Sequence, residues 1–377
     1  MLPKGFNVIN QIHTKTFLPI IGLWYKTFAM NIPTKLALDV LRLQGDAPAD
    51  EAVARMFEEE SPRVVLQQVW ALQNNQNLQE NSLPTYIKNY LAQVVQPITA
   101  TTYAYINHNA NFFQQNAQPY LGMLGLLSLP YCYAGEYGAQ VLYLSDRIQN
   151  QIEKRLLETS KFLLDVLSVD AFLPTGKGWV SIAQVRLLHA IIRKRIQALP
   201  EWNMQWGVPI NQEDMLGTNF AFGWIVARGM EKIGYQVTAE DREALLESWR
   251  VIGCGLGVLP TIMPQNAKEA YILDKRIAER HFRASVVGKL LTKALVEYLQ
   301  PKFPLGLTET YMRFLLGDTI ADYIGIAPTD WKRYLLRVQI LQTRLQEYLP
   351  FSLLPEGNFL DNVRELIQKE GTAFTQQ

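Results

Sequence analysis

The sequence predicts an all-α fold, because helical patterns recur along the whole chain while convincing strand patterns do not. Apolar residues return every three or four positions in segment after segment, and helix-capping motifs stand at the start of several of these segments. The breaks between the segments are short, and none has the composition of a flexible interdomain linker. One large domain covering residues 1–377 is therefore predicted.

Two features are expected in the N-terminal part. Residues 1–29 hold an apolar patch, Phe17 to Tyr25, which Lys26 interrupts and which is too short to span a bilayer. We expect a buried first helix or an extended docking segment there, with an uncleaved anchor as the alternative. No other apolar run approaches membrane length and no export signal is recognised, which favours a cytoplasmic protein without a membrane span. The Asn- and Gln-rich stretch 73–81 is expected to be a surface loop.

Two helices are predicted in the middle of the chain. Residues 146–167 carry apolar side chains on most of the helical circumference, so this helix is expected inside the protein. After the break at 174–178, Ser181 and Gln184 form a capping box, because each side chain can satisfy the other's free backbone amide. An apolar face then follows at helical spacing as far as Pro200, made of Val185, Leu188, Ile192 and Ile196.

Two further helices are predicted in the C-terminal half. Thr238 and Asp241 form a second cap, and the helix that they open is expected to stop at Gly253. A long helix is expected over 329–345. The glycine run at 253–257 follows a helix rather than a strand, so it is predicted to be a close-packed turn and not a phosphate-binding loop.

Composition excludes several classes of function. The formal net charge is +1, so the chain lacks the basic excess that a sequence-independent grip on nucleic acid needs. Two cysteines, Cys132 and Cys254, cannot build a disulfide framework, which fits a reducing compartment. The sequence also lacks the aspartate cluster of terpene synthases, the paired Glu-x-x-His motifs of di-iron bundles, zinc-ligand spacing and the Cys-x-x-Cys-His of covalently attached haem.

The four histidines differ in their surroundings. His13 lies near the chain end, His108 in a polar stretch, and His281 between two arginines, a setting typical of a solvated or propionate-facing side chain. His189 stands instead on the apolar face of the helix at 185–196. A neutral imidazole there can ligate iron while its second nitrogen finds a protein acceptor. A core histidine that is simply hydrogen-bonded to protein is the alternative and the commoner case.

Polar side chains that could serve such a site lie nearby in the pattern. Arg155 and Thr159 stand one turn apart on the preceding helix, and a buried guanidinium needs a partner such as a haem propionate. Arg186 and Arg193 flank His189 by three and four residues, so either could reach a propionate beside the ligand. The alternative for each arginine is a salt bridge to a nearby carboxylate, and for Thr159 a hydrogen bond to its own helix.

Five blocks of the sequence carry a resemblance to a known family. They are VRLLHAIIR at 185–193, WGVPINQED at 206–214, WRVIGCGLG at 249–257, MRFLLGD at 312–318, and Gly45-Asp46 with Ala49-Asp50. They resemble the rubber oxygenase (latex clearing protein) family and the related mpaB-type oxygenases, which share a DUF2236-type catalytic domain. The first block is similar to the haem-ligand helix of that family and the second to its Gly-x-Pro-Ile-Asn-Gln turn. The resemblance extends over residues 40–330.

The resemblance implies non-covalent haem b in a globin-like helical core with additional surrounding helices. It implies that His189 is the proximal iron ligand, and that Arg155 and Thr159 match the family's Arg-x-x-x-Thr on the distal-side helix. The rubber enzymes have a lysine just before that threonine, where this chain has Glu158; a carboxylate there leaves the distal site open, acts as a base, or faces away. Glu136 is the nearest carboxylate to the family's proposed upstream catalytic glutamate.

These observations favour a haem b-dependent oxygenase whose partners are O2 and an apolar small molecule. The expected reaction is oxidative cleavage of a C=C bond in an isoprenoid-like substrate, a cytosolic lipid, terpenoid or quinone tail rather than polymeric rubber. Aromatic side chains are candidates for lining the pocket, with plain core packing as the alternative: Tyr133, Phe162, Phe220, Phe222 and Trp224. Two other hypotheses stay open: a haem or lipid carrier or sensor without turnover, which Glu158 in place of lysine keeps open, and a structural helical protein without a cofactor.

Overall fold

The computed structural model describes residues 35–59, 62–79, 82–145, 152–302, 306–328, 331–348, 360–361, 363–365 and 367. The apolar patch near the N-terminus, His13 and the start of the helix expected at 329 lie outside these residues. Within them every regular element is helical, and β pairing is limited to one isolated bridge between Gly135 and Phe282. The all-α prediction is therefore confirmed.

The helices run in chain order through two halves, with η1, η3, η4 and η5 as 3-10 turns and η2 as a π-helical turn. The first half has α2 (Lys35–Leu41), α3 (Ala47–Glu59), α4 (Pro62–Trp70), η1 (Asn75–Gln79), α5 (Thr85–Val94), α6 (Ala100–Gln115), α7 (Ala117–Met123), η2 (Leu124–Ser128), α8 (Leu129–Tyr133), α9 (Glu136–Leu144) and α10 (Ile152–Leu167). The second half has α11 (Gly178–Gln197), η3 (Met204–Trp206), α12 (Gln212–Phe222), α13 (Trp224–Lys232), α14 (Ala239–Gly255), η4 (Pro260–Ile262), α15 (Ala267–His281), α16 (Val286–Leu299), η5 (Gln300–Lys302), α17 (Thr308–Leu316), α18 (Asp318–Tyr323) and α19 (Lys332–Tyr348).

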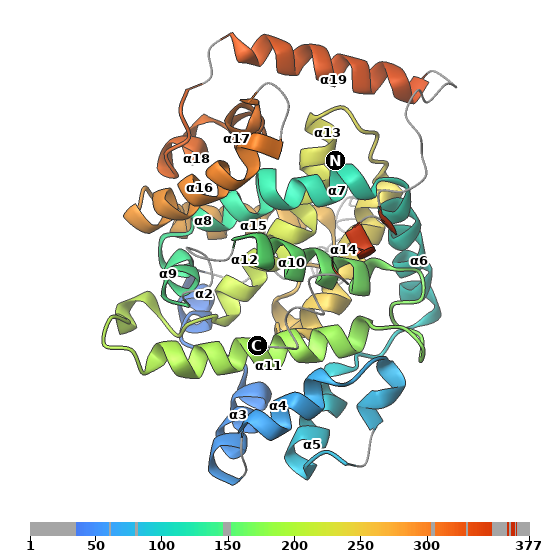
Figure 1. Ribbon diagram of the computed structural model, residues 1–377, viewed down its shortest axis with the longest axis vertical. Helices are drawn as coiled ribbons and strands as arrows, with labels where there is room; N and C mark the ends of the chain where they lie inside the picture. The colour runs from blue at the N-terminus through green and yellow to red at the C-terminus, as the bar shows by residue number, and fades with distance from the viewer. Residues whose placement is uncertain are drawn as a thin grey trace, which may run out of the picture.

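Helix α11 organises the arrangement. It crosses the molecule with α3, α4 and α5 below it and α10, α12 and α14 above it, while α19 lies across the top (Figure 1). Helices α3 and α10 both pack against α11, and α6 packs along α14. One continuous cluster of buried apolar side chains draws on α2 through α18. No helix among the described residues is long and apolar enough to cross a membrane.

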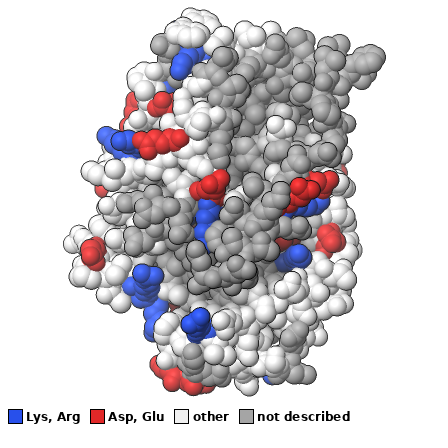
Figure 2. Space-filling view, in the orientation of Figure 1, with Lys and Arg blue, Asp and Glu red and all other residues white. Residues whose placement is uncertain are grey.

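The surface carries charges of both signs close together. On the face shown in Figure 2, Lys and Arg side chains are interspersed with Asp and Glu over the described residues. Some neighbouring charges form ion pairs one turn apart on a single helix, as do Lys161 with Asp165 and Arg55 with Glu51.

Helix α10 lies at the edge of the core rather than inside it. Its described part begins at Ile152, and the side chains that are fully buried are Leu163, Val166 and Leu167. Glu153, Glu158 and Lys161 are exposed on the outer side, and the apolar residues of the first three turns are half-buried. The expectation of a wholly buried helix is therefore wrong, because an amphipathic helix buries one stripe against the core.

The start of α11 is set by a residue far away in sequence. Asn75 Oδ1 accepts hydrogen bonds from the backbone amides of Trp179 (2.9 Å) and Val180 (3.2 Å). Its amide nitrogen donates to the carbonyl of Ala171 at 2.9 Å, which fixes η1 against the turn before the helix. The predicted capping box at Ser181 is therefore wrong, since Ser181 lies inside α11. Of the stretch 73–81, residues 73–79 are described; they lie mostly at the surface as expected, but 75–79 form the 3-10 helix η1 rather than a loop.

The cap at the start of α14 follows the prediction. Thr238 Oγ1 accepts from the amide of Asp241 at 3.1 Å, and the Asp241 carboxylate accepts from the amide of Thr238 at 2.8 Å. The helix ends two residues later than predicted, at Gly255 rather than Gly253. Gly253 is a packing position, because a Cβ there would lie 2.6 Å from the side-chain amide of Asn219.

Candidate functional site

His189 lies in the middle of α11 and carries an unused nitrogen. The residue is half-buried, and its Nδ1 atom is buried without a hydrogen-bond partner among the described residues. Burial lowers the pKa of His189 to about 4, and the positive charges of Arg193 and Arg155 act in the same direction. The imidazole is therefore neutral at neutral pH, which leaves a nitrogen lone pair for a metal or a proton donor.

The side chains that share the His189 face are incompletely covered by protein. Val185, Leu188 and Ile192 are half-buried, whereas the fully buried side of α11 is centred on residues such as Leu187. The predicted apolar face is thus not the most buried one, although Ile196 at its end is buried. Half-covered apolar residues around an unpaired imidazole are what an apolar ligand beside His189 would require.

Arg155, on α10, is one of the two positive charges that act on this histidine, the other being Arg193. Burial raises the pKa of Cys132 and of Tyr133, and the charge of Arg155 opposes that rise at both residues. The same charge lowers the pKa of His189. The guanidinium of Arg155 therefore lies close enough to act on α8 and α11 together, and the structure brings the expected pair Arg155 and His189 into one neighbourhood.

The other candidates on α10 are placed differently. The Thr159 hydroxyl donates to the backbone carbonyl of Arg155 at 2.7 Å, which is the hydrogen bond to its own helix expected as the alternative. Glu158 is exposed to solvent, so of the three possibilities for this carboxylate the one observed is that it faces away.

Glu136 begins α9, three residues after Tyr133. It is half-buried, and its carboxylate makes no hydrogen bond or ion pair with any residue that the structure describes. Glu136 follows α8, where the charge of Arg155 acts on Cys132 and Tyr133, so Glu136 stays a candidate for the site.

Arg186 and Arg193 both use their donors on protein groups. Arg186 is buried and makes a bidentate ion pair with Asp46, with Nε to Oδ2 at 2.6 Å and Nη2 to Oδ1 at 2.7 Å. Its Nη1 also donates to the carbonyl of Gly255 at 3.2 Å. Arg193 donates to the Asp50 carboxylate and to the carbonyls of Pro209 and Ile210. These contacts favour the salt-bridge alternative over the expected contact with a propionate.

Residues from the sequence blocks at 45–50 and 206–214 contact the arginines of α11. We call the set Asp46, Asp50, Arg186, Arg193 and Gln212 the α11 clamp. The Gln212 side chain donates to the carbonyls of Gly45 and Gly257, both at 2.9 Å, and accepts from the amide of Leu259. The sequence patterns alone did not identify these partners. One signal in the sequence was the spacing of the two arginines, which are seven residues apart and therefore share one face of α11.

In the glycine run at 253–257, Gly257 packs against the α11 clamp. Gly257 has φ +95°, and a Cβ there would lie 2.3 Å from Asp46 Oδ2 and 2.9 Å from Arg186 Nε. The absence of a side chain is therefore required for the ion pair to form. The predicted close-packed turn is found at Gly257, whereas Gly253 and Gly255 lie inside α14.

His281 and Arg280 hold a buried carboxylate. Arg280 Nε donates to Glu213 Oε1 at 2.7 Å, and His281 Nε2 lies 2.8 Å from Glu213 Oε2. Burial tends to raise the pKa of Glu213, but the hydrogen bonds from His281 and Arg280 outweigh it and lower that pKa. The ring of His281 therefore faces Glu213, whereas the sequence suggested a solvated or propionate-facing role.

The aromatic residues expected to line a pocket differ in their burial. Tyr133 is buried and lies within the influence of Arg155. Phe220 and Trp224 are buried in the core, while Phe162 and Phe222 are half-buried. No three His, Cys, Asp or Glu side chains in the described part of the chain come together as a set that could hold a metal ion.

Comparison with known proteins adds three findings. The sequence profile of the catalytic domain of the ER-bound oxygenase mpaB/B′ and rubber oxygenase family matches residues 120–345. A rubber oxygenase from Streptomyces sp. (strain K30) is 28% identical over 183 residues, which is 47% of this chain and 45% of that protein, so the match spans less than half of the relative. The structure of latex clearing protein LCP in the closed state has a similar fold, with a TM-score of 0.71 and 23% identity over 87% of this chain and 90% of that one.

Proposed function

Because this chain belongs to the ER-bound oxygenase mpaB/B′ and rubber oxygenase family, we propose that it is a haem b-dependent oxygenase that cleaves a carbon–carbon double bond of an apolar, isoprenoid-like substrate with O2. The observation that carries the proposal is the neutral His189, whose buried Nδ1 has no hydrogen-bond partner among the described residues. A core histidine kept only for packing would ordinarily use at least one ring nitrogen on a protein neighbour, as His281, whose Nδ1 is also unpartnered, does through its contact with Glu213.

The residues around His189 fit a porphyrin. A porphyrin provides four nitrogen ligands itself, so the iron asks the protein for one neutral imidazole, and His189 is proposed as that ligand. The half-covered apolar side chains of Val185, Leu188 and Ile192 would pack against the ring. The α11 clamp is left out of cofactor binding, because it positions the helix that carries His189. When bound, haem b supplies the iron centre that activates O2 toward an alkene.

Two polar groups of the chain are proposed to act on the substrate. Arg155 would hold negative charge that develops on oxygen, since its guanidinium already acts on His189 and on the end of α8. Glu136 would accept an allylic proton, because its carboxylate is half-buried and makes no ion pair within the described residues. Thr159 uses its hydroxyl on the backbone carbonyl of Arg155, and Glu158, being exposed, takes no part.

The name of the Streptomyces relative, a rubber oxygenase, points to a polyisoprene-like substrate. An isoprenoid chain carries no charge, so its recognition would rest on apolar contacts such as those around His189. A cytoplasmic location stays a prediction.

A haem or lipid carrier without turnover is the second candidate. The observation that favours it is Glu158, which stands where the rubber enzymes have a lysine and which points to solvent. The two candidates differ in oxygen consumption, because a carrier would bind its ligand without turning it over.

The test begins with protein expressed with a haem precursor and an absorbance spectrum. We expect a Soret band that His189→Ala removes and that His108→Ala keeps, because His108 pairs with Asp241 and Glu240 on the protein surface. The reduced wild-type protein should then consume O2 with squalene and yield carbonyl products. Full haem retention in His189→Ala would overturn the ligand assignment, and O2 uptake no faster than autoxidation with every isoprenoid tested would overturn the oxygenase.

A further inference from the structure

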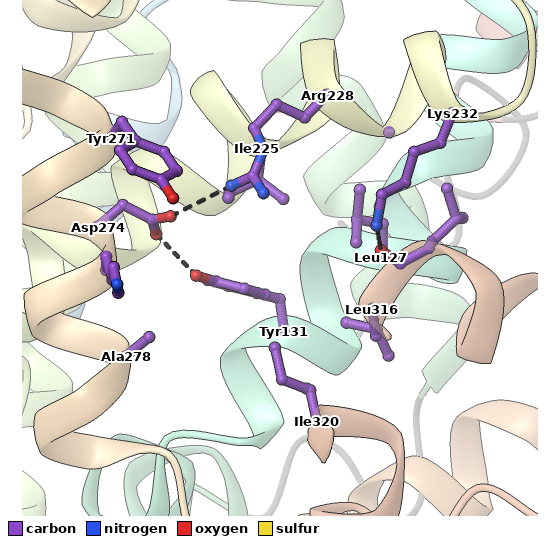
Figure 3. Close-up of a pocket in the computed structure, with 13 residues that line it drawn as sticks. Leu127, Tyr131, Ile225, Arg228, Lys232, Tyr271, Asp274, Ala278, Leu316 and Ile320 are labelled. Carbon is purple, nitrogen blue, oxygen red and sulfur yellow. Dashed lines mark hydrogen bonds and ion pairs between the residues drawn. The ribbon is translucent and has the colours of Figure 1, made fainter. Parts of the chain in front are cut away.

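A cavity of about 290 Å³ lies between α13, α15, the α8 region and α17–α18. Figure 3 shows its polar side chains from α13 and α15 facing apolar ones from α17, α18 and η2. Its volume is at the lower end of the range for small-molecule sites. Nothing in the proposed oxygenase chemistry uses this cavity.

The carboxylate of this cavity is already satisfied by protein. Asp274 Oδ1 accepts from the Tyr131 hydroxyl at 2.7 Å, and Asp274 Oδ2 lies 3.6 Å from Arg228 Nη1 (Figure 3). The Asp274 side chain is 7% exposed. Arg228 and Asp274 therefore compensate each other's charge without a ligand.

Lys232 leaves a positive charge without a matching anion. It stands one turn after Arg228 on α13, and its Nζ donates to the carbonyl of Leu315 at 2.7 Å. No carboxylate pairs with Lys232 among the residues that the structure describes. Burial and the charge of Arg228 both lower the pKa of Lys232, so the environment disfavours its charged form. An anion beside Nζ would remove that penalty.

The third cationic residue at the cavity, Lys275, lies at the protein surface and is close to a carboxylate. Lys275 has a side chain that is 62% exposed, and its Nζ lies 3.7 Å from Glu279 one turn away. The positive charge at the cavity that has no carboxylate partner among the described residues is therefore that of Lys232, which is exposed to solvent and lies next to Arg228.

The opposite wall is apolar. Leu127, Leu316 and Ile320 line the cavity across from the charged groups. A ligand that fits both walls has one anionic group and a short hydrocarbon body.

We propose that this cavity binds a small organic acid, with its carboxylate between Lys232 and Arg228 and its hydrocarbon chain against Leu127, Leu316 and Ile320. The site is separate from the one around His189, although α8 borders both: Tyr131 lies in the cavity, whereas the charge of Arg155 acts on Cys132 and Tyr133. The inference does not rest on the proposed oxygenase function.

The test uses the full chain and straight-chain carboxylates from butanoate to octanoate, followed by calorimetry and thermal shift. Hexanol and hexylamine have the same chain with a neutral and a cationic head. We expect saturable binding of at least one carboxylate, weaker binding of hexanol and none of hexylamine. Lys232→Met should weaken carboxylate binding by about tenfold or more, since it removes a charge-assisted hydrogen bond.

Matched variants separate the pocket from general effects. Lys275→Met removes a nearby surface charge and should leave the affinity unchanged, and Leu316→Trp should block binding by filling the cavity. Asp274→Asn should tighten binding several-fold, because it removes a negative charge near the ligand. Circular dichroism establishes that each variant is folded. Equal binding of acid, alcohol and amine, unchanged affinity in folded Lys232→Met, or no binding of any carboxylate would each overturn the proposal.

Discussion

Removal of the Asp46 carboxylate is expected to be the most costly single change in the α11 clamp. Asp46 and Arg186 have side chains that are 3% and 5% exposed, and they share two short hydrogen bonds. Asp46→Ala leaves the guanidinium buried with backbone carbonyls as its remaining acceptors. Loss of one partner from a buried ion pair costs about 3–5 kcal/mol. For a chain of 377 residues, about 4 kcal/mol corresponds to a fall in Tm of about 5 °C.

Urea denaturation followed by circular dichroism measures this loss as a free energy of unfolding. Asp50→Ala is the matched control, because Asp50 also pairs with an arginine of α11 but its side chain is 37% exposed. Solvent can replace part of that interaction, so we expect a loss of about 1–2 kcal/mol. The double variant Asp46→Leu with Arg186→Met should recover most of the stability, since no buried charge then remains. A smaller loss for Asp46→Ala than for Asp50→Ala would refute the argument that burial sets the cost.

Three further outcomes follow from the same structure. Gly257→Ala should destabilise the fold by about 2 kcal/mol or more, because φ is +95° and the new Cβ would meet Asp46. Gly122→Ala should be neutral or stabilising, because a Cβ at Gly122 has open space around it. Urea unfolding of the two variants compares these effects. In protein without haem, the pKa of His189 is about 4 in the folded state, below its value in the unfolded state, so the unfolded state binds more protons between pH 4 and 6.5. The free energy of unfolding should therefore fall as pH drops through that range, by at most about 3 kcal/mol. His189→Leu should remove this dependence, and an identical pH profile in both proteins would contradict it. Burial raises the pKa of Asp274 to about 6, so the folded state binds more protons than the unfolded state between pH 4 and 6. The free energy of unfolding should therefore fall by up to about 3 kcal/mol as pH rises from 4 to 6. Asp274→Asn should abolish that fall in the same assay.

Local chemistry made the all-α class and the cap at Thr238 predictable. In that cap, donor and acceptor lie three residues apart, so the sequence window contains the whole interaction. At the start of α11 the same reasoning failed, because Asn75 provides the cap from 104 positions away and moves the helix start ahead of Ser181. A capping motif describes what the backbone can do locally, and a distant side chain can replace it.

The site shows the same division. Periodicity placed His189 on a partly apolar face, and the structure leaves its Nδ1 without a partner among the described residues, but the pattern could not tell which side of α11 is buried deepest. Arg186 and Arg193 were recognised as candidate site residues, but their partners Asp46 and Asp50 could not be identified. In each ion pair, more than 130 positions separate the arginine from its aspartate in sequence. The single domain, the globin-like core and the ligand role of His189 stay predictions.

The π-helical turn η2 determines which way α8 faces. It joins α7 to α8 within one continuous helical stretch and places one extra residue in the turn. Each residue advances a helix by about 100°, so deletion of one residue from Leu124–Ser128 would rotate everything after it by that angle relative to α7. Tyr131 would then leave Asp274, and Cys132 and Tyr133 would leave Arg155. The phase of a single turn therefore couples the geometry of two separate sites.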